Sequence, residues 1–190
     1  MAVRYVTIGI TLCLLGMLSI MSPASWAGSL TLSSPSFSAG SSLPLHQIYD
    51  RMGCEGSNLT PTLNWKGLPQ GTQSLAITLL DPDAPTGHGW WHWVVFNLAP
   101  TTTHLASHPG HDEARYLPQG SVSSLTDFGV PGYGGPCPPK GDTPHHYIFT
   151  LFALKIAHIP LPSSASPEQV MPWIRANMLD SAVLVGRYGQ

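Results

Sequence analysis

The segment DPDAPTGHGWWHWVVFN, residues 81–97, carries most of the information about the fold of this chain. It places acids and prolines ahead of a glycine-rich turn and then runs directly into an apolar strand. A second segment, YGGPCPPKGDTPHHYIFTLFAL at residues 133–154, has the same order of Pro/Gly turn, polar side chains and apolar strand. Polar side chains so close to core strands favour a pocket at one end of a sheet.

Outward from these segments, the chain is predicted to form mostly strands. Short runs of β-branched and aromatic residues predict strands over 75–80, 93–98 and 147–154, and weaker runs do so over 30–37, 62–65 and 182–188. The continuous apolarity of the first three is typical of strands that are covered on both faces.

One helix is well indicated near the C-terminus. Ser166-Pro167-Glu168-Gln169 supplies an N-cap, a proline in the first turn and a glutamine that completes a capping box. Pro172 is expected to bend or restart this helix in its second turn. We therefore predict a mainly β protein, an antiparallel β-sandwich with a C-terminal helix packed on it.

Residues 1–27 are interpreted as a cleaved secretory signal peptide. Arg4 provides the positive start, residues 6–21 are mostly apolar, and Ser25-Trp26-Ala27 offers small residues at the cleavage site. A retained anchor is the alternative, but this core is shorter than the ~20 residues needed to span a bilayer. Cys13 follows Leu12 instead of a small residue, so lipidation is not expected. Residues 28–190 then form a single domain in the periplasm or outside the cell.

The composition excludes some partners. Without Arg4 the mature chain keeps 7 basic and 10 acidic side chains, a net charge of −3 with neutral histidines. No basic patch is present to bind nucleic acid, and no stable membrane anchor is expected after signal cleavage. Because only 9% of residues are charged and 19 are prolines, the surface is predicted to be unusually neutral.

The two cysteines of the mature chain, Cys54 and Cys137, are predicted to form a disulfide bond. Two free thiols or half of a metal site are the alternatives, but there is no C-x-x-C and no third mature cysteine. Closing the loop between them would stabilise the fold by roughly 4 kcal/mol in the chain-entropy model. The bond would also tie the MGCEG loop to the second segment and brace the rim of the pocket.

The two segments together resemble the phosphatidylethanolamine-binding protein (PEBP) family, in its bacterial Raf-kinase-inhibitor-like branch. The resemblance rests on Asp81-Pro82-Asp83-Ala84-Pro85 with Trp90 and His92, and on Pro138-Pro139-Lys140-Gly141 with His145 and Tyr147. It extends upstream to Asn58-Leu59-Thr60-Pro61 and Trp65, and it covers nearly all of the mature chain. One departure is His146, which stands where the family usually has arginine.

The resemblance implies a small cavity that binds an anion, such as phosphate or a phospholipid headgroup. His145 and Tyr147 are two residues apart and share one face of a strand, and imidazole, phenol and turn amides all donate hydrogen bonds to anions. Asp81 can either orient a histidine or receive the ammonium of a zwitterionic headgroup. The ligand-binding candidates are Asp81, Asp83, Pro85, Trp90, His92, Gly135, Pro138, His145 and Tyr147.

Neither a metal site nor a cofactor is predicted. His88 and His92, with Asp81 or Asp83, could form a metal site, but their four-residue spacing suits a helix, and this segment is a turn entering a strand. Histidines 104, 108 and 111 lie in a polar loop and are expected to be scattered surface residues.

The leading functional hypothesis is a secreted or periplasmic binding protein for a small anionic or phosphorylated ligand. The second is a kinase or protease inhibitor that acts through its surface on an unknown protein partner, without need of the pocket. A hydrolase with His92 or His145 as base is disfavoured because no G-x-S-x-G elbow supplies a nucleophile. The chain is therefore predicted not to be an enzyme, with no catalytic residues assigned.

Overall fold

The computed structural model of the chain describes residues 1–3 and 29–190. The expected signal peptide, apart from its first three residues, and Cys13 lie outside the described residues. Within the described part of the chain, no helix is both long enough and apolar enough to cross a membrane.

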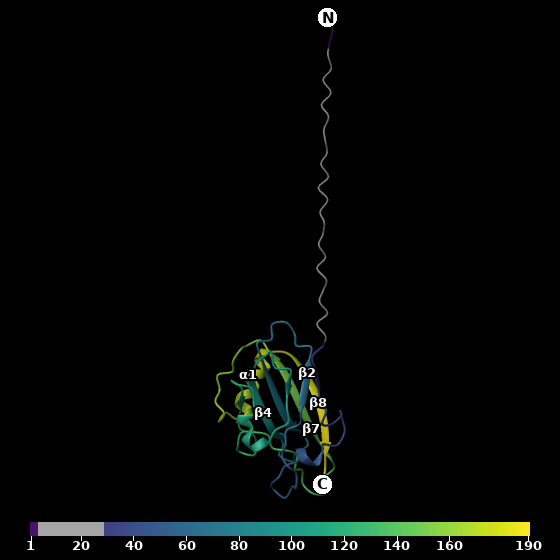
Figure 1. The fold of residues 1–190 in the computed structure, drawn as a ribbon, viewed down its shortest axis with the longest axis vertical. Helices are drawn as coiled ribbons and strands as arrows, with labels where there is room; N and C mark the ends of the chain where they lie inside the picture. The colour runs from purple at the N-terminus through teal and green to yellow at the C-terminus, as the bar shows by residue number, and fades with distance from the viewer. Residues whose placement is uncertain (4–28) are drawn as a thin grey trace.

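Two antiparallel sheets and one α-helix make up the domain (Figure 1). The larger sheet has the order β6-β4-β3-β7-β8, with β3 at Ser74–Asp81, β4 at Trp90–Leu98, β6 at Val122–Ser123, β7 at His145–Leu154 and β8 at Met178–Tyr188. The smaller sheet has the order β1-β2-β5, with bounds Thr31–Ser33, Leu63–Lys66 and His104–Leu105. The helices are the 3-10 turns η1 (Leu45–Gln47) and η2 (Gly110–Arg115) and the α-helix α1 (Pro167–Asn177).

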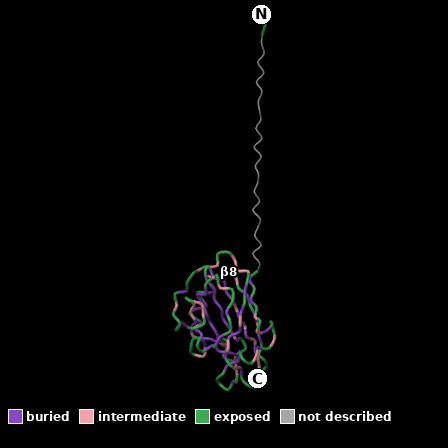
Figure 2. The backbone as a smooth tube through the Cα atoms, viewed as in Figure 1, coloured by how far each residue is buried: buried purple, intermediate pink, exposed green. Residues whose placement is uncertain are grey.

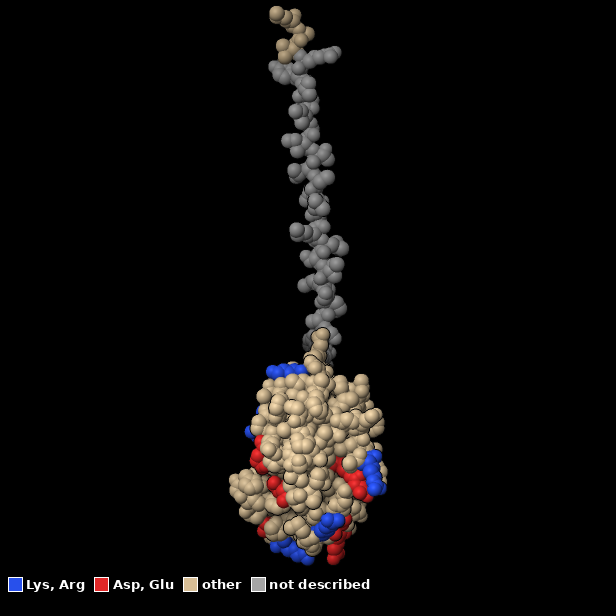
Figure 3. Space-filling view, turned by 90° about the vertical axis from the view of Figure 1, so that its left-hand side faces the viewer, with Lys and Arg blue, Asp and Glu red and all other residues tan. Residues whose placement is uncertain are grey.

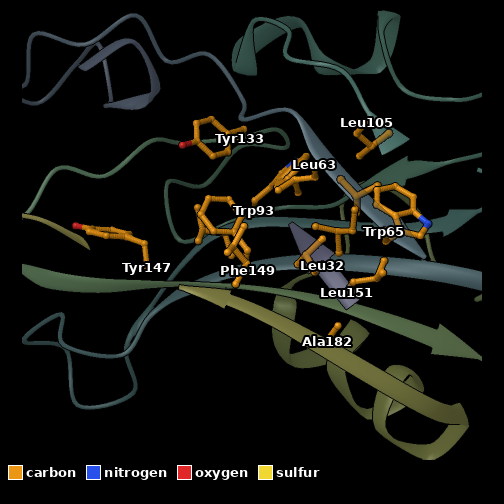
Figure 4. Close-up of a cluster of buried hydrophobic side chains, with 14 of the residues drawn as sticks. Leu32, Leu63, Trp65, Trp93, Leu105, Tyr133, Tyr147, Phe149, Leu151 and Ala182 are labelled. Carbon is orange, nitrogen blue, oxygen red and sulfur yellow. The ribbon is translucent and has the colours of Figure 1, made fainter. Parts of the chain in front are cut away.

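The main core lies between the two sheets. Figure 4 shows Leu63 and Trp65 of β2 on one side, with Phe149 and Leu151 of β7 on the other. Inward residues alternate along β3, where Leu75, Ile77 and Leu79 are all fully buried. In Figure 2 the buried backbone is concentrated in these central strands.

The opposite face of the larger sheet is covered by α1. Val170, Met171 and Ile174 of the helix pack with Val94 and Phe96 of β4 in a second buried cluster. Because both faces of β3, β4 and β7 are covered, these strands need apolar residues at nearly every position. The predicted mainly β fold with a C-terminal helix is therefore confirmed, and so is the capping box between Ser166 and Gln169.

Strand boundaries differ from the predictions where edges of sheets are involved. The run over 30–37 forms a strand only at Thr31–Ser33, because Pro35 ends the pairing with β2. In contrast, β8 begins at Met178, four residues before the predicted start, and pairs with β7 along nearly its whole length. Its outward residues are polar or isolated apolar side chains, so periodicity alone underestimates its length.

A β-bulge interrupts the pairing of β3 with β4 next to the polar residues of the first segment. The register shifts from Leu79–Trp93 to Leu80–Trp91, which leaves His92 without a partner on β3. Trp91 packs against the cluster beneath α1, whereas His92 and Trp93 both lie on the opposite side of the sheet. The bulge thus turns the imidazole of His92 away from the position that strict alternation would give it.

The surface is sparsely charged. Figure 3 shows one face of the molecule that is largely free of charged side chains, with Lys, Arg, Asp and Glu scattered toward its edges. This agrees with the low charged fraction of 9%.

Asn97 fastens the end of β4 to the segment before α1. Its φ is 59°, and its side-chain amide donates to Ile159 O at 3.1 Å and accepts from Ile159 N at 2.8 Å. We expect Asn97→Ala to lower the free energy of unfolding by about 2 kcal/mol, since it loses both hydrogen bonds and keeps a strained φ. Chemical denaturation measures this loss. Asn97→Gly is the matched control, because glycine relieves the strain but not the lost bonds; equal stability of all three proteins would contradict the prediction.

Candidate ligand-binding site

A pocket of about 180 Å³ lies where β3 ends and where β4 and β7 begin. The loop after β3 and the Pro-rich loop before β7 form its rim, so the two sequence segments meet at one site. Its lining residues are Met52, Asp81, Ala84, Pro85, Thr86, Trp90, His92, Phe128, Cys137, Pro138, Pro139 and His145.

Asp81 and His145 form a buried pair at the base of the pocket. His145 Nδ1 lies 2.8 Å from Asp81 Oδ2, and the side chains are only 5% and 4% exposed. The second carboxylate oxygen, Oδ1, accepts the backbone N–H of Asp83 at 2.9 Å. His145 Nε2 lies 3.5 Å from the half-exposed carboxylate of Asp142. The imidazole of His145 therefore stands between two carboxylates.

His92 is held by the loop that contains Gly134. Its Nδ1 lies 2.7 Å from the carbonyl oxygen of Gly134, and Gly134 N–H donates to the carbonyl of His92 at 2.9 Å. Burial lowers the pKa of His92 to about 4, an effect only partly offset by the Gly134 carbonyl and the Asp81 carboxylate. His92 is therefore a neutral imidazole at pH 7 in the ligand-free protein.

Tyr147 lies behind His92 and does not line the pocket. Its ring centroid is 5.3 Å from that of His92 in an edge-on arrangement, and the residue is fully buried. Burial, with the Asp81 carboxylate as a smaller cause, raises the pKa of the Tyr147 phenol well above its usual range. The phenol oxygen has no hydrogen-bond partner of standard geometry among the described residues.

The rim loop at residues 133–137 is held in place by hydrogen bonds to Asn58. Asn58 donates from Nδ2 to Tyr133 O at 3.0 Å and accepts Gly135 N–H at 2.8 Å. The predicted disulfide between Cys54 and Cys137 is present and closes an 83-residue separation. Cys137 itself lines the pocket, so the bond lies directly in the rim.

Six of the nine predicted ligand-binding residues line this pocket: Asp81, Pro85, Trp90, His92, Pro138 and His145. Tyr147 does not line the pocket but packs against the ring of His92, which does. Gly135 has its amide bonded to Asn58, and a Cβ there would lie 2.2 Å from the carbonyl oxygen of Gln47. Its absent side chain thus allows two loops to touch.

Asp83 points to the outer surface of the rim. Its Oδ2 accepts a hydrogen bond from the backbone N–H of His146 at 2.7 Å and lies 2.8 Å from His146 Nδ1. These interactions, the backbone bond first, lower the pKa of Asp83. His146 therefore braces the rim through Asp83.

Sequence reasoning missed Met52 and Phe128 as lining residues. Phe128 packs edge-on to both Trp90 and His92, with ring centroids 5.5 and 5.3 Å away. It also covers Gly134, where a Cβ would lie 2.3 Å from the Phe128 ring. An isolated aromatic residue in a glycine-rich loop was the only signal available for it.

The expectation that His108 lies at the surface is wrong. His108 is only 6% exposed. The backbone N–H of Thr60 donates to His108 O, and the backbone N–H of His108 donates to the Thr60 hydroxyl, so the two loops are held together. Its Nε2 lies 3.5 Å from Oε1 of buried Glu113, which also accepts from the Trp93 indole and the Ser123 hydroxyl. Sequence reasoning gave no sign of this buried polar cluster.

His104 is exposed as expected, and His111 pairs with Asp50 at 2.8 Å in a half-exposed contact. His88 lies on the exposed turn of the first segment and is absent from the lining of the pocket that contains His92. Among residues 29–190, no group of three or more His, Cys, Asp or Glu side chains is arranged to hold a metal ion.

A second and wider hollow, of about 480 Å³, lies over η2 and includes Glu113, Arg115 and Ser121 in its lining. None of the predicted ligand-binding residues contributes to it. We therefore take the smaller pocket as the candidate site, since it holds the buried titratable side chains of both segments.

Comparison with known proteins shows the family of this chain. A family model described as phosphatidylethanolamine-binding protein matches residues 33–189. UPF0098 protein YbcL of Escherichia coli is 41% identical over 178 residues, which cover 94% of this chain and 97% of YbcL. Putative lipoprotein LppC of Mycobacterium tuberculosis is 36% identical over 166 residues, which cover 87% of this chain and 75% of LppC.

Solved structures agree with this result. The crystal structure of E. coli YbcL, described as a new member of the mammalian PEBP family, has a TM-score of 0.83 and 42% identity and covers 86% of this chain and 99% of YbcL. A putative PEBP homologue from Chlamydia trachomatis, CT736, has a TM-score of 0.71 and 28% identity and covers 85% of this chain and 98% of that chain.

The fold and its neighbours define the class as a two-sheet β protein of the PEBP type. The chain belongs to the phosphatidylethanolamine-binding protein family, and its similarity to YbcL places it in the bacterial branch. The resemblance carried by the two sequence segments is thereby confirmed.

Proposed function

We propose that the chain is a binding protein of the bacterial cell envelope that captures a small anion, either free phosphate or the phosphorylated headgroup of a lipid, in the 180 Å³ pocket. The observation that carries the proposal is the pair of buried imidazoles, His92 and His145, whose Nδ1 atoms are both engaged by protein oxygens. With Nδ1 engaged, Nε2 of His92 is left for a ligand, whereas Nε2 of His145 lies 3.5 Å from the carboxylate of Asp142.

The size and walls of the pocket favour a headgroup-sized ligand. Trp90, Phe128 and the rim prolines supply apolar walls around the few polar groups, an arrangement that is typical of small-molecule sites. The prolines fix φ on the rim and reduce the entropy that ordering would cost on binding. Asp81 keeps free lone pairs on its carboxylate, so the ammonium of phosphoethanolamine is a further group that the base of the pocket suits.

An envelope location is supported by two observations. The disulfide Cys54–Cys137 is typical of proteins that fold in an oxidising compartment. The relative LppC of M. tuberculosis is a putative lipoprotein. Binding without turnover is proposed, and no catalytic step is assigned to the pocket histidines.

Anion binding is tested by thermal unfolding of the purified protein. Saturation at a hundred times Kd stabilises a protein by about 2.7 kcal/mol, so phosphate or phosphoethanolamine should raise Tm by about 5 °C or more. We expect His92→Ala/His145→Ala to lose this shift and His104→Ala/His158→Ala, which changes two exposed histidines, to keep it. No shift of the wild-type protein with any of these ligands at millimolar concentration would remove the proposal.

The two sources of phosphate are separated by a second measurement. Co-sedimentation with vesicles of phosphatidylethanolamine, compared with vesicles of phosphatidylcholine, tests for the lipid headgroup. Retention on phosphatidylethanolamine vesicles that soluble phosphoethanolamine reverses would identify the headgroup, whereas a thermal shift without retention would identify the free anion.

A further inference from the structure

The hydrogen-bond partner of His92 fixes where its proton lies. A carbonyl oxygen only accepts, so the 2.7 Å contact with Gly134 O places the ring proton on Nδ1. A neutral imidazole has only one N–H, and its other nitrogen is then a bare lone pair. Nε2 of His92 is therefore an acceptor, and the residue lines the pocket.

The surroundings keep this ring neutral. Asp81 from β3 and His145 and Tyr147 from β7 are the titratable groups that face it, and Phe128 and Trp90 add apolar rings on the pocket side. Burial dominates over the favourable Asp81 charge, which is why the pKa of His92 falls to about 4.

His145 does not supply a spare donor to compensate. Its Nδ1 lies 2.8 Å from Asp81 Oδ2 and its Nε2 lies 3.5 Å from Asp142 Oδ2, so both ring nitrogens already face carboxylates of the protein. Two kinds of hydrogen-bond acceptor thus face the pocket: Nε2 of His92 and the carboxylate oxygens of Asp81. A fully deprotonated anion placed there would set its oxygens against these acceptors.

We propose that the pocket takes up its anion together with one proton, which is held between Nε2 of His92 and an oxygen of the ligand. The inference rests on the proposed function. One proton leaves the solvent and no bond between heavier atoms forms or breaks. For a phosphate monoester the proton can arrive on the ligand, whereas for sulfate it must be bound by the protein.

Such coupling makes binding depend on pH. While the ring stays neutral in the free protein and protonated in the complex, the affinity rises by about tenfold for each unit by which pH falls. A binding site in the envelope would then hold its anion more tightly in an acidic medium and release it as the medium becomes neutral.

Isothermal titration of the protein with sulfate tests the proposal, because sulfate carries no proton between pH 5 and pH 7. Titrations at each pH in two buffers of different ionisation enthalpy measure the protons taken up. We expect uptake approaching one proton per sulfate and an affinity that rises by up to a hundredfold from pH 7 to pH 5. Equal affinity at both pH values, without proton uptake, would overturn the proposal.

His92→Gln is the informative variant, since its amide offers an N–H near the position of Nε2 without titrating. It should bind sulfate with an affinity that does not change with pH and without proton uptake, whereas His158→Gln, an exposed control, should behave as wild type. Wild-type uptake that persists in His92→Gln and disappears in His145→Gln would assign the proton elsewhere and refute the role of His92.

NMR of the wild-type protein labelled with ¹⁵N-histidine gives a second readout that needs no variant. Nε2 of His92 should have the shift of a bare nitrogen without sulfate and that of a protonated nitrogen with it. A nitrogen that stays bare in the complex contradicts the inference while leaving the proposed function intact; absence of any anion binding removes both.

Discussion

Removal of the disulfide by Cys54→Ala/Cys137→Ala is expected to lower the free energy of unfolding by roughly 4 kcal/mol. The bond spans 83 residues of sequence, so its loss releases a long loop in the unfolded chain and raises the entropy of that state. Alanine is chosen because Cys54 is buried at 6% exposure, where a serine hydroxyl would add its own penalty. Urea denaturation of the oxidised wild type and the variant measures the difference.

The same variant should also weaken ligand binding. Cys137 lines the pocket, and the bond holds it against the turn that carries Met52, another lining residue. Wild type unfolded in the presence of a reductant is the control, since it should unfold at the midpoint of the variant. If the oxidised wild type and the variant share one midpoint, the disulfide does not stabilise the fold.

Acidification is expected to destabilise the protein by roughly 3 kcal/mol through His92 alone between pH 7 and pH 4. The pKa of this residue is about 4 in the folded protein, against its ordinary value of 6.5. Between these values the unfolded chain binds the extra proton, so stability rises with pH in this window. The stability that the neutral ring of His92 provides is fully present above pH 6.5 and is lost as pH falls toward 4.

His92→Gln isolates this contribution, because the other histidines are common to both proteins. The difference in unfolding free energy between wild type and His92→Gln should move by roughly 3 kcal/mol across the window, in favour of the variant at low pH. Urea denaturation in chloride, free of phosphate and sulfate, avoids the coupling to bound anions. A difference that does not change with pH would show that His92 is not the neutral buried ring described above.

Much of the fold was predictable because burial on both faces leaves a direct trace in sequence. The runs 75–80, 93–98 and 147–154 became β3, β4 and β7, whose sides are covered by the small sheet and by α1. The two-residue strands β5 and β6 were not predicted, since two residues carry no periodicity. The edge strand β8 was placed but too short, because only one of its faces is buried.

Within the site, the residues at strand ends were predictable and those in loops were not. Asp81, His92 and His145 lie at the ends of apolar strands that the sequence identifies, so their meeting at one end of the sheet follows from antiparallel pairing. Phe128 and Met52 reach the pocket from loops whose paths depend on Asn58, Gly134 and the disulfide. Such contacts join residues far apart in the chain, and no local pattern encodes them.

The segment at residues 81–97 and its counterpart at 133–154 determined by themselves the chemistry available to the pocket: two imidazoles, a carboxylate and rigid turns beside core strands. Only the tertiary structure decided what each group does. The bulge at His92 and the Gly134 carbonyl set the direction and tautomer of one ring, while Asp81 was committed to His145. The physical reason is that residue types fix which protons and charges are possible, but long-range packing fixes which atoms meet.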